Sequence, residues 1–277
     1  MKKGINHWSF PQGRTVAECI ALAKEAGYEG IELALSKTGD LSLGSTEQEI
    51  KQIKQVLTHT GMEIASLASG LGWEYQLTSS NVQNRNQAIE IITRQLDVAA
   101  QLEADTILVV PGVVNAEVTY DQAYDNAMEA LAKLSKTAAS YKVAIGVENV
   151  WNKFLLSPLE MKDFLDKINS SYVGAYFDVG NVLLTGYPEQ WIKILNKRIK
   201  KVHLKDYRRE AAGLAGFVDL LAGDVDYPAV TGALTEIGYN GYVIAEMIPP
   251  YTHYTEQILF NASRSMDAIL GRTTGGK

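Results

Sequence analysis

The sequence is poor in cysteine and histidine and has no long apolar segment. Its 277 residues include one cysteine, Cys19, which cannot form a disulfide framework and indicates a reducing compartment. The N-terminal residues lack the apolar core of a signal peptide, and no apolar run approaches the roughly 18 residues of a membrane span. We therefore expect a cytoplasmic protein without a membrane partner.

Basic residues are also scarce relative to acidic ones. Lys and Arg number 26 against 32 Asp and Glu, which gives a net charge of −6. Nucleic-acid binding requires a clustered basic face, so we do not expect a nucleic-acid partner. The four histidines, His7, His59, His203 and His253, exclude any site that needs five or more histidine ligands.

What the sequence does contain is a repeated unit, in which a helix end and a turn residue precede a short apolar strand. Glycine at such a turn suits the left-handed conformation that commonly ends a helix. The strands are short and almost entirely apolar, as expected of strands buried on both faces of a parallel sheet. Eight strands are predicted, starting about every 34 residues. Five lie in repeat units at 26–33, 60–67, 104–110, 141–148 and 237–246, and three more lie at 4–7, 173–178 and 201–204.

The segments between these strands have the apolar spacing of amphipathic helices, and three of them start at a residue followed by proline. The helices are expected at 15–26, 46–58, 81–102, 120–141 and 254–270, and from residues 157, 187 and 227 onward. Eight strands alternating with eight helices predict an α/β protein with one domain over residues 1–277, a single (β/α)8 TIM barrel. A doubly wound open sheet is the alternative, but no Gly-x-Gly-x-x-Gly follows the first strand.

Two predicted loops are longer than this scaffold requires. One covers residues 70–81 after the third strand, and the other covers 207–226 after the seventh. Both follow the carboxyl ends of strands, which is the face of such barrels that carries active sites. We expect these loops to act as lids over a site there.

Four ionisable residues follow apolar runs at the ends of four consecutive strands: Glu148, Asp178, His203 and Glu246. Any one of them alone is commonly a helix cap, an ion-pair partner or a satisfied buried histidine. Together, three carboxylates at one barrel mouth repel one another strongly unless a cation lies between them. One imidazole and three carboxylates suit Mn2+, Co2+ or Mg2+, whereas structural zinc sites use thiolates. We therefore predict a site for one divalent metal ion.

The same strand ends resemble those of the sugar isomerase and epimerase family built on the xylose-isomerase-like barrel. The resemblance covers nearly the whole chain and is most specific at Glu148, 177–181, 202–206 and 242–246. It implies an isomerase of carbohydrate metabolism in which these strand ends hold one divalent metal ion. Mn2+ is the ion that we expect, with Co2+ or Mg2+ as alternatives. It also implies that Glu148 and Glu246 are the catalytic pair and that the chain forms a dimer or tetramer.

Several positions distinguish branches of this family. Asn181 stands where the D-tagatose 3-epimerase branch has histidine, whereas Lys205 and Asp206 match the L-ribulose-5-phosphate 3-epimerase branch. Phe154 stands where some free-ketose epimerases have a further glutamate, and a basic residue after the strand-seven histidine is retained as Arg209. The resemblance therefore implies a small sugar or sugar phosphate as substrate and weighs against a free ketose.

The expected chemistry is proton transfer at a carbon next to a carbonyl. A metal bound to the carbonyl and hydroxyl oxygens stabilises the enediolate, while one carboxylate removes the proton and another returns it. Glu148 and Glu246 are the predicted acid/base pair of such a ketose 3-epimerase or isomerase. The residues expected to contact the substrate are His7, Trp8, Glu32, Trp73 and Asn181, with Lys153 and Arg209 as candidates for holding a phosphate.

Three other functions share parts of this pattern. A metal-dependent dehydratase of the inosose or dehydroshikimate type would use the same metal and a base, and would release water. A non-catalytic sugar-binding barrel would tolerate loss of Glu246. The barrel DNA-repair endonuclease with three zinc ions requires more histidines than this chain places at strand ends.

Overall fold

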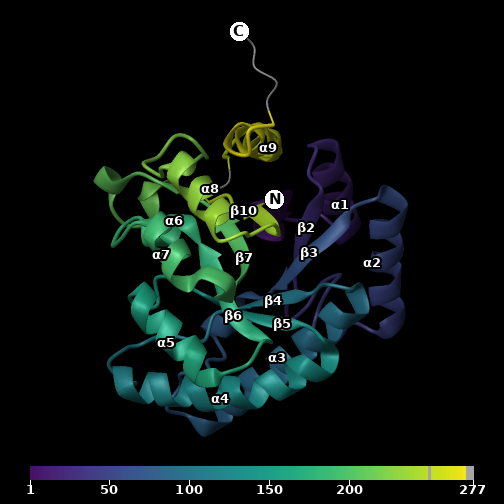
Figure 1. Ribbon diagram of the computed structural model, residues 1–277. Helices are drawn as coiled ribbons and strands as arrows, with labels where there is room; N and C mark the ends of the chain where they lie inside the picture. The colour runs from purple at the N-terminus through teal and green to yellow at the C-terminus, as the bar shows by residue number, and fades with distance from the viewer. Residues whose placement is uncertain (249–250, 273–277) are drawn as a thin grey trace.

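A computed structural model describes residues 1–248 and 251–272. Eight parallel strands close into a barrel in the order β1-β10-β7-β6-β5-β4-β3-β2, and Figure 1 shows the helices packed around them. The predicted (β/α)8 TIM barrel is therefore confirmed. The barrel strands are β1 (Lys2–Asn6), β2 (Gly30–Ala34), β3 (Glu63–Ala68), β4 (Thr106–Val109), β5 (Ala144–Glu148), β6 (Val173–Asp178), β7 (Ile199–Leu204) and β10 (Tyr242–Ala245).

A long helix follows each barrel strand, and in Figure 1 the two longest, α3 and α4, lie side by side. The short helix α6 (Val179–Val182), which was not expected, directly follows β6. Within the described residues, no helix is long and apolar enough to cross a membrane. The long helices are α1 (Val16–Glu25), α2 (Glu47–Thr60), α3 (Val82–Leu102), α4 (Tyr120–Tyr141), α5 (Pro158–Ile168), α7 (Pro188–Leu195), α8 (Tyr227–Glu236) and α9 (Gln257–Ile269).

Local sequence explains where these helices begin. Thr15 and Thr46 each accept a hydrogen bond from the backbone of a glutamate three residues later, and that glutamate bonds back to the threonine. Such capping boxes satisfy backbone N–H groups that lack a partner inside the helix. Ser157 caps α5 and is followed by proline at the first helical position, as the sequence predicted.

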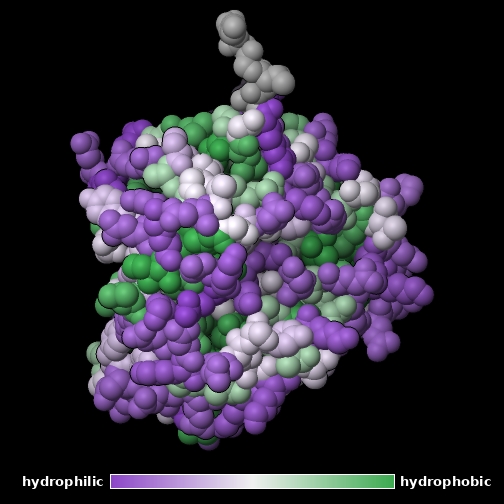
Figure 2. Space-filling view, viewed as in Figure 1, coloured by the Kyte–Doolittle hydropathy of each residue, from purple (hydrophilic) through white to green (hydrophobic). Residues whose placement is uncertain are grey.

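The barrel has two cores with different compositions. An apolar core lies between strands and helices, while the inside of the barrel holds Tyr176 and Tyr242 with small and aliphatic side chains. Tyr176 requires a glycine at position 146 of the neighbouring strand β5, because a Cβ on Gly146 would lie 2.9 Å from the Tyr176 side chain. The outer surface is more polar than either core. In Figure 2, hydrophilic side chains cover most of the visible face, and separate hydrophobic areas lie between them.

We expect Gly146→Ala to lower the free energy of unfolding by about 1–3 kcal/mol, because the added methyl displaces Tyr176 in a filled core. Urea denaturation would measure the change. Gly232→Ala in α8 is the matched control, because nothing lies within 4 Å of its added Cβ. The control is expected to be neutral or to stabilise by up to about 1 kcal/mol. Equal stability of the two variants would contradict the packing described for Tyr176.

The two long loops follow strand ends as expected. The first contains the short helix η2 (Gly70–Trp73). The second contains an antiparallel pair, β8 (Asp206–Tyr207) with β9 (Phe217–Val218), and the short helices η4 (Arg209–Ala211) and η5 (Leu214–Gly216). The buried Asp206 carboxylate holds this second loop. It accepts hydrogen bonds from four backbone N–H groups, those of Tyr207 at 2.8 Å, Leu221 at 2.9 Å, Gly223 at 3.1 Å and Val225 at 3.2 Å.

Candidate active site

Four strand ends bring the predicted metal-binding residues together. Glu148 and Asp178 are the last residues of β5 and β6, His203 lies in β7, and Glu246 directly follows β10. Asp178 and His203 are also lateral partners in the β6–β7 pairing. One ligand atom from each of the four residues lies within 4.8 Å of the others, and all four side chains are buried. The cluster expected from the sequence is therefore present as a single group.

The His203 imidazole lies at the centre of this group. Its Nδ1 atom is 2.8 Å from Glu246 Oε2 and 3.8 Å from both Glu148 Oε1 and Asp178 Oδ2. Lys205, two residues after His203, points to the same side of the strand, as the alternation of side chains requires. Its Nζ lies 3.0 Å from Asp178 Oδ2 and 2.8 Å from Glu246 Oε2. Lys205 was not among the predicted site residues, although its spacing of two residues from His203 is a signal in the sequence that places both side chains on one side of the strand.

Burial and mutual repulsion shift the ionisation of these groups. Burial raises the pKa of Glu148 to about 7, and the Glu246 carboxylate adds to the rise. Burial acts on Glu246 in the same direction, but Lys205 and His203 outweigh it and hold the pKa of Glu246 below its usual range. Burial lowers the pKa of His203, but Glu32 and Glu246 outweigh it and raise that pKa. The surrounding carboxylates thus favour a positive charge at the position of the His203 imidazole.

A divalent cation fits the cluster on two grounds. Asp178 Oδ2, His203 Nδ1 and Glu246 Oε2 are buried and have no hydrogen bond of good geometry. Among the described residues, Lys205 is the one lysine or arginine near both oxygens, so the three atoms have capacity left for a further positive partner. Carboxylates about 4–5 Å apart repel by about 3–4 kcal/mol at an effective dielectric constant of 20. When all three carboxylates are ionised, the Lys205 ammonium balances only one of them, and a divalent cation would balance the other two. Oxygen ligands with one imidazole are the ligand set of such an ion.

Two asparagines fix the position of Asp178. The side chain of Asn149 donates to the Asp178 carbonyl and accepts its N–H, both at 2.8 Å. Asn181 donates its backbone N–H to Asp178 Oδ1 at 2.8 Å, and its side chain donates to the Asn149 carbonyl at 3.0 Å. Because Asp178 is also the N-cap of α6, the start of this short helix and the carboxylate are positioned together.

A pocket of about 480 Å³ opens above the cluster. Glu148, Glu246, Lys205 and Asn181 line its polar part. Its walls are largely apolar and include Trp8, Trp73, Trp151, Leu214, Phe217 and Ile248. Trp8, Trp73 and Asn181, which were predicted to contact a substrate, all line this pocket. Phe217, which sequence reasoning missed, enters the pocket because the β8–β9 pair turns the second loop back over the barrel mouth.

The structure does not bring His7 or Glu32 into this pocket. His7 lies in the short helix η1 (His7–Ser9), packs edge-on against Phe10 at a ring separation of 6.3 Å, and has a lowered pKa chiefly because it is buried. Glu32 is fully buried beneath the cluster, where its Oε1 lies 2.8 Å from His203 Nε2. The carboxylate therefore contacts the back of the imidazole ring rather than the pocket.

The two residues proposed for phosphate binding also lie outside the site pocket. Lys153 lines a neighbouring pocket of about 320 Å³, which shares Trp151 and Asn181 with the site pocket. Arg209 donates through Nε to the Leu183 carbonyl at 3.1 Å, and its guanidinium lies 5.6 Å from the centre of the Tyr187 ring. The Arg209 side chain is thus held against the segment between α6 and α7 and does not line the site pocket.

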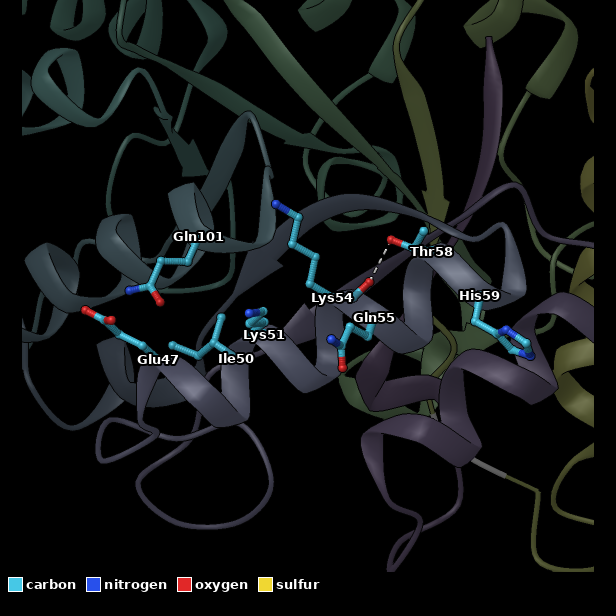
Figure 3. A pocket seen from close by; sticks show the side chains of 8 residues that line it. All are labelled: Glu47, Ile50, Lys51, Lys54, Gln55, Thr58, His59 and Gln101. Atoms are coloured by element: carbon cyan, nitrogen blue, oxygen red, sulfur yellow. Dashed lines mark hydrogen bonds between the residues drawn. The ribbon is translucent and has the colours of Figure 1, made fainter.

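A larger, shallow hollow of about 830 Å³ lies on the outer surface over α2 (Figure 3). Seven of its eight lining residues come from α2, and the other is Gln101 of α3. They include Lys51, Lys54 and His59, and none of the strand-end residues lines it. The hollow is therefore separate from the cluster of Glu148, Asp178, His203 and Glu246.

Comparison with known proteins identifies related sequences. The sequence model of the xylose isomerase-like TIM barrel family matches residues 20–264. SgbU of Haemophilus influenzae, which carries a provisional name as an L-ribulose-5-phosphate 3-epimerase, is 27% identical over 252 residues, covering 89% of this chain and 88% of the relative. UlaE of Salmonella heidelberg, an L-ribulose-5-phosphate 3-epimerase, is 25% identical over 252 residues, covering 88% of this chain and 86% of the relative.

Solved structures share the architecture at lower identity. A D-psicose 3-epimerase from Clostridium cellulolyticum H10, solved with D-tagatose, superposes with a TM-score of 0.79 at 17% identity, over 98% of this chain and 97% of the other. The IolI protein, solved with a zinc atom bound, gives a TM-score of 0.84 at 17% identity, over 99% and 100% of the two chains. At these identities the likeness supports the fold.

Proposed function

Because the chain belongs to the xylose isomerase-like TIM barrel family, we propose that it is a divalent-metal-dependent sugar isomerase of the ketose 3-epimerase type. The observation that carries this proposal is the buried group of three carboxylates and one imidazole at four consecutive strand ends. The relatives named L-ribulose-5-phosphate 3-epimerase are isomerases, which agrees with this class of reaction.

In the proposed mechanism, Glu148, Asp178, His203 and Glu246 would hold the ion. A bound divalent ion would supply Lewis-acid stabilisation of negative charge on the substrate oxygens. One of the two glutamates removes the proton from the carbon next to the carbonyl, and the electron pair of that C–H bond moves into the enediolate. The other glutamate returns a proton to the opposite face, so the configuration inverts and the composition is unchanged. Glu148 on β5 and Glu246 after β10 both line the pocket, as this requires.

The test is incubation of the Mn2+-loaded protein with a panel of ketoses and ketose phosphates in deuterated water. We expect deuterium at the carbon next to the carbonyl and a product with the composition of the substrate, observed by NMR and mass spectrometry. A product that has lost water would identify a dehydratase instead. No exchange with any sugar of the panel would count against the proposed function.

The walls of the pocket favour a sugar without a phosphate group, which is the opposite of what the sequence led us to expect. The rings of Trp8, Trp73 and Trp151 offer apolar surface for the C–H face of a sugar. Among the described residues that line the pocket, the one basic side chain is Lys205, which is already shared by Asp178 and Glu246. Backbone N–H groups of the loop after β7, which often bind phosphate in such barrels, donate to Asp206.

We therefore expect kcat/KM for a free ketose to exceed that for its terminal phosphate ester by about tenfold or more, because the ester loses hydration without gaining a free cation. Steady-state kinetics on the pair would measure the ratio. Arg209→Gln should leave this ratio unchanged, with Lys153→Gln as the companion variant. A selective rise in KM for the phosphate ester in either variant would place phosphate recognition at that residue and contradict the expectation.

A further inference from the structure

A connected set of hydrogen bonds lies inside the barrel, directly beneath the metal-binding cluster. Its members are fully buried: Asn6, Glu32, Ser66, Tyr176 and His203. The Glu32 carboxylate is the centre of the set. Its Oε1 accepts a hydrogen bond from the Asn6 side-chain amide and lies 2.8 Å from His203 Nε2. Its Oε2 accepts hydrogen bonds from the Ser66 hydroxyl, at 2.5 Å, and from the Tyr176 hydroxyl.

Irregularities in two strand pairings set this arrangement. Asn6, Glu32 and Ser66 are lateral partners on β1, β2 and β3, and the β2–β3 register shifts between Ile31 and Glu32. The β6–β7 register shifts between Ala175 and Tyr176. Such bulges re-aim the side chains that follow them, and they are frequent next to active sites. Here both shifts occur at residues whose side chains meet, Glu32 and Tyr176.

The directions of the hydrogen bonds can be derived from the donors. The backbone N–H of Trp8 donates to Asn6 Oδ1 at 2.6 Å, so the Asn6 NH2 group faces Glu32 and can only donate. Glu32 receives hydrogen bonds on both oxygens, from the Asn6 amide on Oε1 and from the Ser66 and Tyr176 hydroxyls on Oε2, so it acts as a carboxylate that only accepts. His203 must then donate its Nε2–H to Glu32. Its Nδ1 atom faces Glu148, Asp178 and Glu246, and lies 2.8 Å from Glu246 Oε2.

We propose that Glu32 is a positioning residue, which holds His203 through Nε2 and so presents Nδ1 to the divalent ion. Carboxylates that bind the second nitrogen of a ligand histidine fix the orientation and tautomer of the ring. The edge-on contact of the Tyr176 ring with His203, at 4.6 Å between ring centres, supports the same orientation. The proposed role of Glu32 in ion binding does not depend on the proposed function. Only the contribution of the bound ion to turnover rests on that function.

The first experiment compares Mn2+ binding by wild type and Glu32→Gln, using titration calorimetry on metal-stripped protein. We expect affinity to fall by about 10–100-fold, because the amide no longer fixes the imidazole. The visible spectrum of the Co2+-loaded protein should change as well, since it reports the ligand geometry rather than overall stability. Ser66→Ala is the matched control, because it removes one donor to Glu32 without touching His203, and its affinity should stay close to that of wild type.

A second measurement does not depend on the folding of a variant. In the Zn2+-loaded wild type, 15N NMR of the histidine side chains should show the His203 proton on Nε2 and the metal on Nδ1. The opposite assignment would overturn the proposal, as would a folded Glu32→Gln protein with wild-type Mn2+ affinity and an unchanged Co2+ spectrum. If wild type binds Mn2+ as described but epimerises no sugar, the proposed function fails while the role of Glu32 stands.

Discussion

Glu246→Gln is expected to abolish exchange of the substrate α-proton with solvent and to lower turnover by about 10²–10⁴-fold. The amide cannot accept or return a proton, but its oxygen still faces the metal-binding cluster, so most of the bound metal should be retained. NMR in deuterated water would measure exchange, and elemental analysis would measure the metal content of the same sample.

The matched control for this variant is Glu236→Gln, which makes the same chemical change on the surface. Glu236 pairs with Lys193 at 2.7 Å, and both side chains are more than half exposed. Exposed pairs of this kind contribute little, so the control should keep its activity and stability. Proton exchange at the wild-type rate in a metal-loaded Glu246→Gln protein would remove this glutamate from the catalytic pair.

Removal of divalent ions is the second large effect that we expect. A chelator should abolish turnover, and Mn2+ should restore it, because the enediolate loses its Lewis-acid stabilisation without the ion. Stability should change as well. An ion at roughly 100 times its Kd stabilises the native state by about 2.7 kcal/mol, which corresponds to about 5–10 °C in Tm for a chain of this size. Calorimetry with and without Mn2+ would measure the shift.

A variant that lacks two ligands tests whether the shift comes from this cluster. Asp178→Asn combined with His203→Gln should show little dependence of Tm on Mn2+, because half of the ligand set is gone. A chelated sample shown by elemental analysis to be free of metal, yet fully active, would contradict the metal dependence. A metal-dependent Tm in the double variant would point to a second ion site.

The fold could be predicted because the barrel strands are buried on both faces. Gly30–Ala34 and Val173–Asp178 are buried at every position, and such runs stand out against the amphipathic helices between them. The cluster could be predicted for a related reason. A carboxylate directly after an apolar run, as at Glu148 and Asp178, lies at the carboxyl end of its strand, and these ends meet at one rim.

The partners of Glu32 and Arg209 could not be predicted in this way. In the sequence, Glu32 follows an apolar residue near a strand end, as Glu148 does. Its contact with His203 depends on a register shift that leaves no mark in the apolar pattern. The position of Arg209 depends on how the second loop folds, and loop side chains have no periodicity from which to infer their direction. For both residues, the pairing of distant segments decides the contacts.

The way in which Asp206 holds the second loop has a consequence for how this protein can acquire new specificities. Its four hydrogen bonds go to main-chain N–H groups, which every residue except proline possesses. Attachment of the loop is thus nearly independent of the identity of most side chains that it carries, such as Leu214 at the pocket rim. Gly223 is an exception, because a Cβ there would lie 2.2 Å from Asp206 Oδ1. Libraries that randomise the loop while keeping Asp206 and Gly223 should therefore yield many folded barrels with altered substrate ranges.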